Sequence, residues 1–219
     1  SIFVWKYYNG KYKLIKPAKL FLIRHAPVSS RKGFFPEHDP DAVIKKIQLK
    51  KLANVIPDNS TWYVSPLKRT IQTAEALSKY ISYSQKTEEK NLAEQNFGDW
   101  SGKKISDVWK ILKKNHSKHN FSFISPEVSP PNGESYIQQC KRVSHWLKNL
   151  SILENENIVV IAHSGTIKAI FSHTLKIKPE FTIGIDINHL SLSIFEVLTK
   201  KDSKYKGGRY RLLALNREI

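Results

Sequence analysis

The stretch Phe21-Leu22-Ile23-Arg24-His25-Ala26-Pro27 decides the fold of this chain. Its apolar residues predict a short buried strand, which ends by presenting an arginine and a histidine side by side before a loop. An arginine fork can hold a phosphate oxygen bidentately while the adjacent imidazole attacks phosphorus. The alternative is a strand that ends in two polar residues without a shared task. The dipeptide alone does not decide between the two readings.

A second stretch, from Ser65 to Ala74, reads Ser-Pro-Leu-Lys-Arg-Thr-Ile-Gln-Thr-Ala. The apolar residues just before it, 62–64, predict a strand, and Pro66 favours the first position of a helix. Arg69 is therefore expected in the first helical turn at the carboxyl end of a strand, where α/β folds collect their ligands. Free amides and the helix dipole favour an anion at that place.

Two further stretches follow in order along the chain. In the first, from Leu92 to Gly102, the carboxylate of Glu94 precedes an aromatic turn that is punctuated by glycine. In the second, the apolar residues 158–162 predict a buried strand that ends in His163, and a small hydroxylated turn then leads into another helix. Together the four stretches predict one phosphate site.

The four stretches resemble the motifs of the histidine phosphatase superfamily, in its phosphoglycerate mutase-like branch. The Arg-His-Gly motif of that family appears as Arg24-His25-Ala26, and its Ser-Pro-x-x-Arg-x-x-Gln-Thr-Ala motif is matched by residues 65–74. Its Glu-x-x-Phe/Tyr-Gly motif is matched by residues 94–98, and its second histidine motif by residues 162–165. All four occur in the family's order, and they span about residues 20 to 170 of the chain.

Two positions depart from the family pattern. Ala26 replaces the usual glycine, and because alanine adds only one methyl group we expect the phosphate pocket to survive. The family often has an asparagine six residues after the nucleophile, where this chain has Arg31 followed by Lys32. These cations are either phosphate contacts or solvated loop charges.

The resemblance implies a metal-independent phosphomonoester hydrolase that needs no cofactor and works through a phosphohistidine intermediate. His25 would attack phosphorus, and Glu94 would protonate the leaving oxygen and then take a proton from the attacking water. The phosphoryl oxygens would be held by Arg24, Arg69 and His163, with Ser164 and Arg31 as further substrate contacts. Gln95 and Asn96 are neighbours that could orient Glu94. We expect surface or core roles for the remaining histidines: His38, His116, His119, His145, His173 and His189.

The segment 130–135 reads Pro-Pro-Asn-Gly-Glu-Ser and resembles a segment of α-ribazole phosphatase-like members. The arginine pair of the cofactor-dependent mutases is not found in this part of the chain. Both observations favour hydrolysis of a small phosphorylated metabolite, with α-ribazole phosphate as a candidate. The alternatives are a phosphoglycerate mutase-type phosphotransferase, a protein phosphohistidine phosphatase, and a non-catalytic basic module for a phospho-ligand or nucleic acid. Joint retention of His25, Glu94 and His163 argues against the last.

At 219 residues with 40% hydrophobic composition, the chain can fill one sizeable core, so 1–219 is expected to be a single domain. Alternating strands and helices predict a three-layer α/β/α sandwich with a mostly parallel central sheet. After the first motif strand, helices are expected near 40–52, 67–81, 105–112 and 132–150, and another helix after His163. The last strands are expected at 190–198 and 210–215. Asn9-Gly10 predicts an additional hairpin within 1–16. Residues 95–133 are expected to form a cap, with Trp100, Trp109, Phe121 and Phe123 as candidates for its apolar wall or its packing onto the core.

The net charge is +17, which would attract an anionic substrate or nucleic acid. We favour a lysine-rich solvated surface over a nucleic-acid partner, because the lysines are spread along the chain. The single cysteine, Cys140, excludes an internal disulfide and is expected to be inert. No apolar run reaches membrane length, and residues 1–19 carry no signal-peptide pattern. These features predict a cytoplasmic location and no membrane partner.

Overall fold

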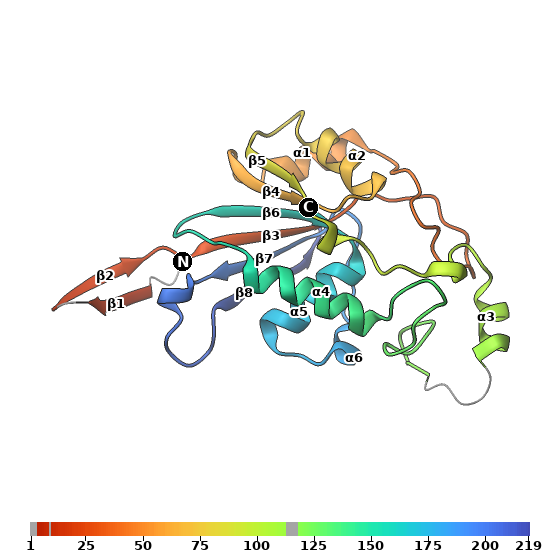
Figure 1. Cartoon of the computed structure of the whole chain (residues 1–219). Coiled ribbons are helices and arrows are strands. Elements are labelled where there is room, and N and C mark those ends of the chain that lie inside the picture. Colours follow the sequence, from red (N-terminus) through yellow and green to blue (C-terminus); the bar gives the residue numbers. More distant parts are fainter. Residues whose placement is uncertain (1–3, 9, 113–117) are drawn as a thin grey trace.

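The middle of the protein is a six-stranded sheet in the computed structural model, which describes residues 4–8, 10–112 and 118–219 (Figure 1). The sheet consists of β3 (Ala18–Arg24), β4 (Ser60–Val64), β5 (Tyr83–Glu88), β6 (Asn157–Ala162), β7 (Leu192–Val197) and β8 (Tyr210–Arg217). In space the strands follow the order β5-β4-β6-β3-β7-β8. The strands from β5 to β3 pair in parallel, whereas β7 and β8 are antiparallel to their neighbours. The predicted mostly parallel sheet is therefore confirmed.

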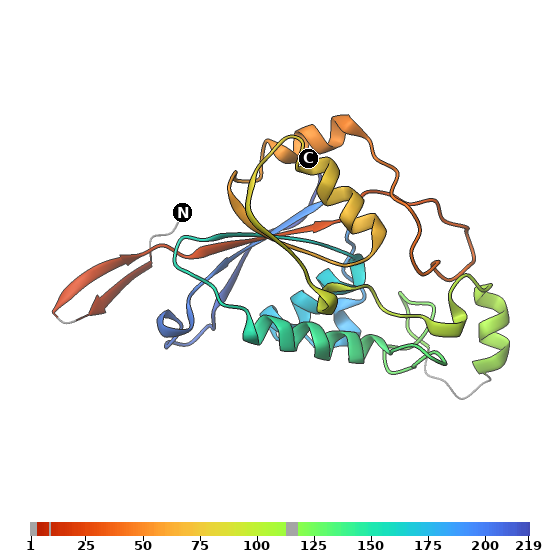
Figure 2. The ribbon, with the colours of Figure 1, turned by 45° about the horizontal axis from the view of Figure 1, so that its top comes forward.

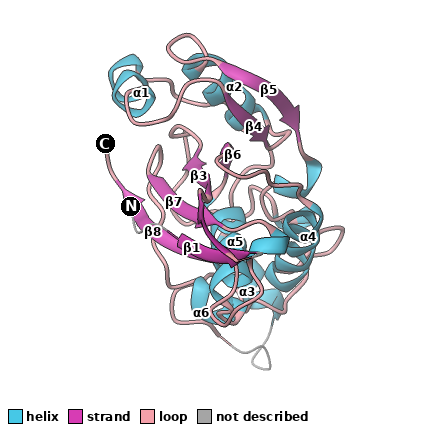
Figure 3. Cartoon of the chain, turned by 90° about the vertical axis from the view of Figure 1, so that its left-hand side faces the viewer, coloured by secondary structure: helices cyan, strands magenta, loops and turns pink. Residues whose placement is uncertain are grey.

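Helices cover both faces of this sheet (Figure 3). One face carries α1 (Lys46–Ala53) and α2 (Lys68–Leu77), and the other carries α4 (Tyr136–Asn149), α5 (Ser164–Leu175) and the short α6 (Pro179–Thr182). The longest of them, α4, begins with a capping box in which the Ser135 hydroxyl accepts from the Gln138 amide and the Gln138 side chain accepts from the Ser135 amide. The predicted α/β/α layers are confirmed.

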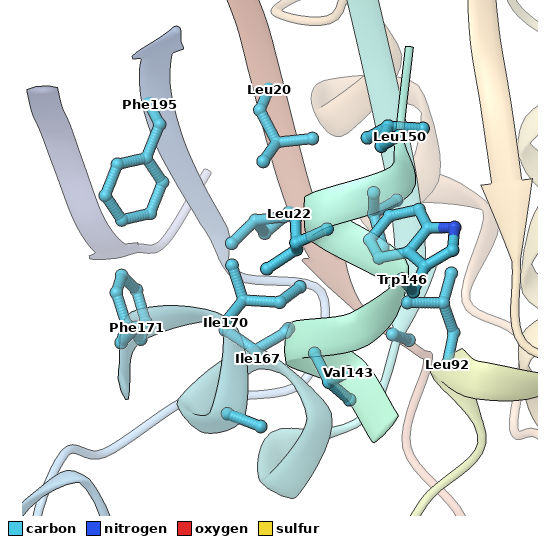
Figure 4. Packing of buried hydrophobic residues seen from close by; sticks show 14 of the residues in the cluster. Leu20, Leu22, Leu92, Val143, Trp146, Leu150, Ile167, Ile170, Phe171 and Phe195 are labelled. Carbon is cyan, nitrogen blue, oxygen red and sulfur yellow. The ribbon is translucent and has the colours of Figure 1, made fainter. Parts of the chain in front are cut away.

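The central strand β3 supplies both cores, because its side chains alternate between the two faces of the sheet. Leu20 and Leu22 pack with α4 and α5, as Figure 4 shows. Phe21 and Ile23 point the other way and pack with residues of α1 and α2. A strand that is buried on both faces needs an unbroken apolar run. For this reason the strand at residues 20–23 can be recognised from the sequence.

A separate apolar cluster holds together the segment expected to form a cap, called the cap below, which lies at the end of the molecule away from the N-terminal strands (Figure 2). The cap contains the 3-10 turn η2 (Gly98–Trp100) and α3 (Ile105–Leu112). Phe35, from the loop after β3, is 1% exposed and contacts the ring of Trp100, with the ring centroids 5.9 Å apart. The Phe35 amide also donates to the Lys103 carbonyl. The loop after β3 is therefore a structural part of the cap.

The first two strands, β1 (Val4–Tyr8) and β2 (Lys11–Ile15), form an antiparallel hairpin that projects from the sheet (Figures 1 and 2). This pair is a separate two-stranded sheet. Asn9 of the expected turn lies outside the described residues, as does His116. Two further 3-10 turns, η1 (Lys90–Leu92) and η3 (Lys200–Asp202), complete the described elements.

Several boundaries differ from the sequence expectation. The helix expected from Pro40 begins only at Lys46, because the preceding chain is extended and the Val43 amide donates to the Pro27 carbonyl. The edge strand β5 and the four-residue α6 were not predicted. Within the described residues, no helix is both long enough and apolar enough to span a membrane.

Leu22 tests the central packing, because its side chain is fully buried at the middle of the sheet. We expect Leu22→Ala to lower the free energy of unfolding by about 2–5 kcal/mol, from the lost transfer energy and the cavity left behind. Leu153→Ala is the matched control, since Leu153 is 66% exposed, and it should change stability by less than about 0.5 kcal/mol. Urea unfolding curves measure both; equal effects would contradict this account of the core.

Candidate active site

The predicted site residues converge at the carboxyl edge of the sheet, where β4, β6 and β3 lie side by side. Parallel neighbours place their last residues together, and the register pairs Arg24 with Ala162. Helix N-termini and loops that follow these strands complete the cluster. The residues involved are Arg24 at the end of β3, His25 after it, Ser65 after β4, Arg69 in the first turn of α2, Glu94 after η1 and His163 after β6.

The His25 ring is fixed by a hydrogen bond at each nitrogen. Its Nδ1 lies 2.6 Å from the Ala26 carbonyl oxygen, and the Arg69 Nε lies 3.3 Å from its Nε2. A carbonyl only accepts and a guanidinium only donates, so Nδ1 carries the proton and Nε2 presents a lone pair. Nε2 is thus the nitrogen that is available for attack on an electrophile.

Burial keeps this imidazole neutral. His25 is 4% exposed, and burial is the main cause that lowers its pKa to about 2, with His163 and Arg69 lowering it further. The hydrogen bond to the Ala26 carbonyl acts in the opposite direction, and it is outweighed. Ala26 itself does not have a positive φ, so alanine is accommodated there without backbone strain.

His163 is completely buried, with its ring centroid 5.1 Å from that of His25. Its Nε2 lies 2.7 Å from the Ser65 hydroxyl oxygen, which also accepts from the Leu67 amide. The Ser65 hydroxyl can donate to Nε2 when the His163 proton is on Nδ1, or accept from Nε2 in the other tautomer. Burial, followed by the two nearby guanidiniums, holds the pKa of His163 well below its usual range.

Arg24 Nε and His163 Nδ1 are both buried without a hydrogen-bond partner among the described residues. Arg24 Nε is a donor, and His163 Nδ1 is one in the tautomer in which Ser65 donates to Nε2; unpaired buried donors are uncommon in folded proteins. Arg24 also donates from Nη1 to the Ile187 carbonyl at 2.6 Å, and Arg69 donates from Nη1 to the His38 carbonyl at 3.2 Å. The site therefore offers donors and positive charge that an anion could use.

The Glu94 carboxylate lies opposite these cations and is held from two helices. One oxygen accepts from the Gln139 side chain of α4 at 2.8 Å, and the other accepts from the Gly165 amide at the start of α5 at 3.1 Å. Its charge acts on both Arg24 and Arg69, whose pKa values it raises against the larger lowering by burial. The carboxylate thus shares one site with the guanidiniums.

The side chains of Gln95 and Asn96, expected to orient Glu94, make other contacts. They donate to the carbonyls of Glu134 and Asn132, and so fix the loop to the segment before α4. The backbone amide of Gln95 does contact the carboxylate, because it donates to Glu94 Oε1 at 3.1 Å. Gln139 and Gly165, which hold the carboxylate from the two helices, were not singled out for this role in the sequence.

Two glycines permit close backbone or side-chain approaches in this region. A Cβ at Gly165 would lie far inside van der Waals contact of the Glu94 carboxylate. Gly98 has φ +49°, and a Cβ there would overlap the Pro131 carbonyl, where the Asp99 amide donates to the same oxygen at 2.9 Å. The glycine that ends the Glu-x-x-Phe-Gly motif therefore lets two loops pack backbone to backbone.

A pocket of about 430 Å³ opens beside Arg69 and Glu94. Its wall comes from the loop after β3, the start of α2, the loops around 90–101 and 133–134, and Arg142 of α4, and it includes Phe97 as an aromatic residue. None of the four aromatics expected for an apolar wall lines it: Trp100 is buried in the cap core, and Trp109, Phe121 and Phe123 are exposed.

Two predicted substrate contacts lie differently from the central residues. Ser164 begins α5 and is half-buried next to His163. Arg31 lies on the surface, where it forms an ion pair of 3.7 Å with Glu37, covers the Phe34 ring and donates to the Gly102 carbonyl. It does not line the pocket, so its contact with substrate stays a prediction.

His189 belongs to the site, although the sequence analysis assigned it a surface or core role. Its ring centroid lies 5.0 Å from that of His25, edge-on. No motif and no adjacent catalytic residue type marked it in the sequence. Cys140, in contrast, is buried on α4 with a pKa raised by burial to about 11, as expected for an inert thiol. The described residues contain no group of three His, Cys, Asp or Glu side chains arranged to hold a metal ion.

A substitution at Gly165 tests whether the position of the Glu94 carboxylate matters for activity. We expect Gly165→Ala to lower phosphomonoester turnover at least about tenfold, because the added methyl group must displace the Glu94 carboxylate. The sequence predicts that this carboxylate is a general acid, a role typically worth about 10²–10⁴-fold. Gly184→Ala is the control, since a Cβ at Gly184 would meet no atom closer than 3.5 Å. Steady-state rates with an alkyl phosphate measure both. Equal rates in the two variants would contradict a requirement for this position of the Glu94 carboxylate.

Comparison with known proteins agrees with this geometry. The model of the histidine phosphatase superfamily (branch 1) matches residues 20–206. A protein of Hydrogenobacter thermophilus named "Putative phosphoserine phosphatase 2" is 28% identical over 165 residues, covering 69% of this chain and 76% of that protein. The 2,3-bisphosphoglycerate-dependent phosphoglycerate mutase of Cytophaga hutchinsonii is 26% identical over 148 residues, covering 64% of this chain and 67% of that protein.

The crystal structure of the α-ribazole phosphatase from Shigella flexneri superposes with a TM-score of 0.71 at 20% identity, covering 91% of this chain and 96% of that one. This likeness shows a shared fold. The family match spans most of the chain and includes all four motifs, whose residues the structure brings to one site. The chain is therefore an enzyme of the histidine phosphatase superfamily, branch 1.

Proposed function

We propose that this enzyme hydrolyses small phosphomonoesters through a phosphohistidine on His25. The observation that carries the proposal is the fixed tautomer of this residue. Its Nδ1 proton is committed to the Ala26 carbonyl, and the lone pair on Nε2 lies beside the Arg69 guanidinium. A neutral, immobilised imidazole next to a cation is suited to attack a phosphate that the cation has bound.

In the first step, the lone pair of His25 Nε2 forms a bond to phosphorus while the bond from phosphorus to the alcohol oxygen breaks. Glu94, in its acid form, gives its proton to that leaving oxygen. The hydrogen bond from Arg69 Nε to His25 Nε2 must be released before attack. A phosphate oxygen is a stronger acceptor for a guanidinium than an imidazole nitrogen is, so substrate binding itself would release it.

In the second step, water attacks the phosphohistidine and gives a proton to Glu94. The nitrogen–phosphorus bond breaks, inorganic phosphate leaves, and His25 returns to its neutral form. We propose that Arg24, Arg69 and His163 stabilise the charge on the phosphoryl oxygens in both steps, without a metal ion. The unpaired buried nitrogens Arg24 Nε and His163 Nδ1 support this role.

The alcohol part of the substrate would occupy the pocket beside Arg69 and Glu94. Its volume of about 430 Å³ falls in the range of small-ligand sites. Polar side chains on its wall favour a hydrophilic alcohol: Glu37, Lys90, Gln95, Asn96, Ser101 and Glu134. The α-ribazole phosphate and phosphoserine named for similar proteins are both candidates for this pocket.

Hydrolysis is preferred here over a mutase reaction. A mutase must hold a second phosphate, and besides Arg69 the pocket wall contains one arginine, Arg142. That guanidinium pairs with Glu134 at 2.6 Å and donates to the carbonyls of Asn91, Ala93 and Glu94. Because Arg142 is occupied within the protein, it is poorly placed to bind a second phosphate.

We further propose that residues 1–219 work as one catalytic domain, in which residues 95–133 act as a cap over the substrate and the N-terminal hairpin is an addition. The pocket wall supports the cap assignment, because residues 95–97 contribute to it. The cytoplasmic location stays a prediction.

His25→Ala tests the nucleophile. We expect it to abolish turnover of p-nitrophenyl phosphate while the thermal unfolding midpoint stays close to that of the wild type, because the attacking lone pair is gone. The wild type, quenched during turnover in the presence of a chelator, should carry acid-labile phosphate on His25. His145→Ala is the control, since His145 is exposed on α4 and should keep full activity. Phosphate on another residue would overturn the mechanism.

Glu94→Gln and Arg69→Ala separate acid catalysis from charge stabilisation. Glutamine cannot deliver a proton, and a general acid is worth about 10²–10⁴-fold, so Glu94→Gln should lose most with alkyl phosphates and least with p-nitrophenyl phosphate. Arg69→Ala should lose similar factors with every ester, because each one develops phosphoryl charge. A series of aryl and alkyl phosphates measures this dependence. A flat profile for Glu94→Gln would exclude Glu94 as the acid.

A further inference from the structure

His189 contacts the proposed nucleophile in two ways. Its Nδ1 lies 3.1 Å from the His25 carbonyl oxygen, and because a carbonyl only accepts, Nδ1 is the donor. Its ring also meets the His25 ring edge-on, with centroids 5.0 Å apart and planes at 61°. Both the backbone and the side chain of His25 are thus restrained by one residue that is distant in sequence.

The loop that carries His189 is built around the end of β3. Residue Ile187 accepts from the Arg24 guanidinium at 2.6 Å, and the Leu190 amide donates to the Arg24 carbonyl at 3.0 Å. Leu190 has φ +58°, a left-handed conformation that is unusual for a leucine, and it is buried. Such backbone strain persists only where the surroundings over-determine it, and it gathers at functional sites.

The same loop is tied to the last strand. The Asn188 amide donates to the Asn216 side-chain oxygen of β8 at 2.6 Å, and the Asn188 side chain donates to Glu218 at 2.6 Å. The loop therefore spans from the rigid edge of the sheet to the Arg24-His25 pair. This anchorage gives His189 a fixed position from which to hold His25.

We propose that His189 is a positioning residue for the phosphorylation step: its Nδ1–H holds the His25 carbonyl, so that His25 Nε2 stays aimed at phosphorus. The inference rests on the proposed role of His25 as nucleophile. His189 makes this contact as a donor in either protonation state, because Nδ1 carries hydrogen in both. It needs no titration to act.

The charged and titratable groups that face His189 are Arg24 and His25 at the end of β3, and Arg69 from α2. Burial, followed by the Arg24 charge, lowers the pKa of His189, against the opposing effect of its bond to His25. A neutral ring beside two guanidiniums avoids adding a further positive charge. These surroundings suit a residue that orients rather than one that transfers protons.

Three substitutions separate positioning from other roles. His189→Asn keeps a donor near the place of Nδ1, His189→Gln moves the amide toward the place of Nε2, and His189→Phe keeps ring contact without any donor. The rate of phosphoenzyme formation is measured by rapid quench with p-nitrophenyl phosphate, together with KM and the pH dependence. His145→Phe is the control for removal of an exposed histidine.

We expect His189→Phe and His189→Gln to slow phosphorylation about ten- to hundredfold with little change in KM, since small misplacements of reacting groups cost that much. His189→Asn should stay within about threefold of the wild type and keep its pH profile. Thermal midpoints show whether each variant is folded, and the Asn variant keeps the test valid should the Phe variant unfold.

Three results would overturn the inference. Full activity in His189→Phe would show that the contact is not used. Activity that is retained in His189→Gln but lost in His189→Asn would place the function at Nε2. Loss of one limb of the pH profile in His189→Asn would indicate proton transfer. Each result presumes that the wild type is labelled on His25. Labelling on another residue would refute the proposed function, and this inference with it. Labelling on His25 together with one of these three results would refute this inference alone.

Discussion

The site depends on keeping guanidinium charges and neutral imidazoles together in one buried volume. Burial lowers the pKa values of Arg24 and Arg69, yet a guanidinium starts so high that it stays charged, whereas the same burial leaves His25 and His163 neutral. A lysine in place of either arginine would lose its charge more readily. The arrangement places the proposed nucleophile His25, whose Nε2 lone pair accepts from Arg69, directly beside permanent positive charge, which suits phosphoryl transfer.

Carboxylates near the site partly balance its two guanidinium charges. Glu94 acts on both guanidiniums, while Asp186 acts on Arg24 and Asp39 lies 3.6 Å from Arg69. An anionic ligand that binds only the folded state would stabilise it by mass action. A phosphate bound at this site would therefore also stabilise the folded enzyme.

Each half of the site is held by a different layer of the fold. The half that contains Arg24 and His25, the proposed nucleophile, is held by the 187–190 loop, which is anchored to β8. The half that contains Glu94, the proposed acid, is held by Gln139 on α4 and by the amide at the start of α5. Because α4 and α5 pack on the sheet through a continuous apolar core, the distance between the two halves is fixed by the packing of the whole domain.

Sequence reasoning found the parts whose signal is local. The strands that end at Arg24 and Ala162 are apolar on both faces, and each is followed at once by a predicted site residue. The edge strand β5 could not be found in this way, because Tyr-Ser-Gln-Lys-Thr-Glu is largely exposed and shows no apolar alternation. The positions of His189 and Gln139 in the site were not predicted for another reason. Their roles come from contacts across 164 and 45 positions of the chain, and no rule based on sequence spacing predicts such contacts.

The difference between local and distant signals also explains why the chemistry of this enzyme is easier to infer than its substrate. The phosphate end is built from strand ends and helix starts, where position in the motif dictates position in space. The alcohol end is built from cap loops whose packing depends on backbone approaches such as that of Gly98 to Pro131, and on ion pairs such as Arg142 with Glu134. Substitutions in these loops would reshape the pocket wall while leaving the sheet edge intact, so substrate choice can vary on an unchanged phosphoryl-transfer site.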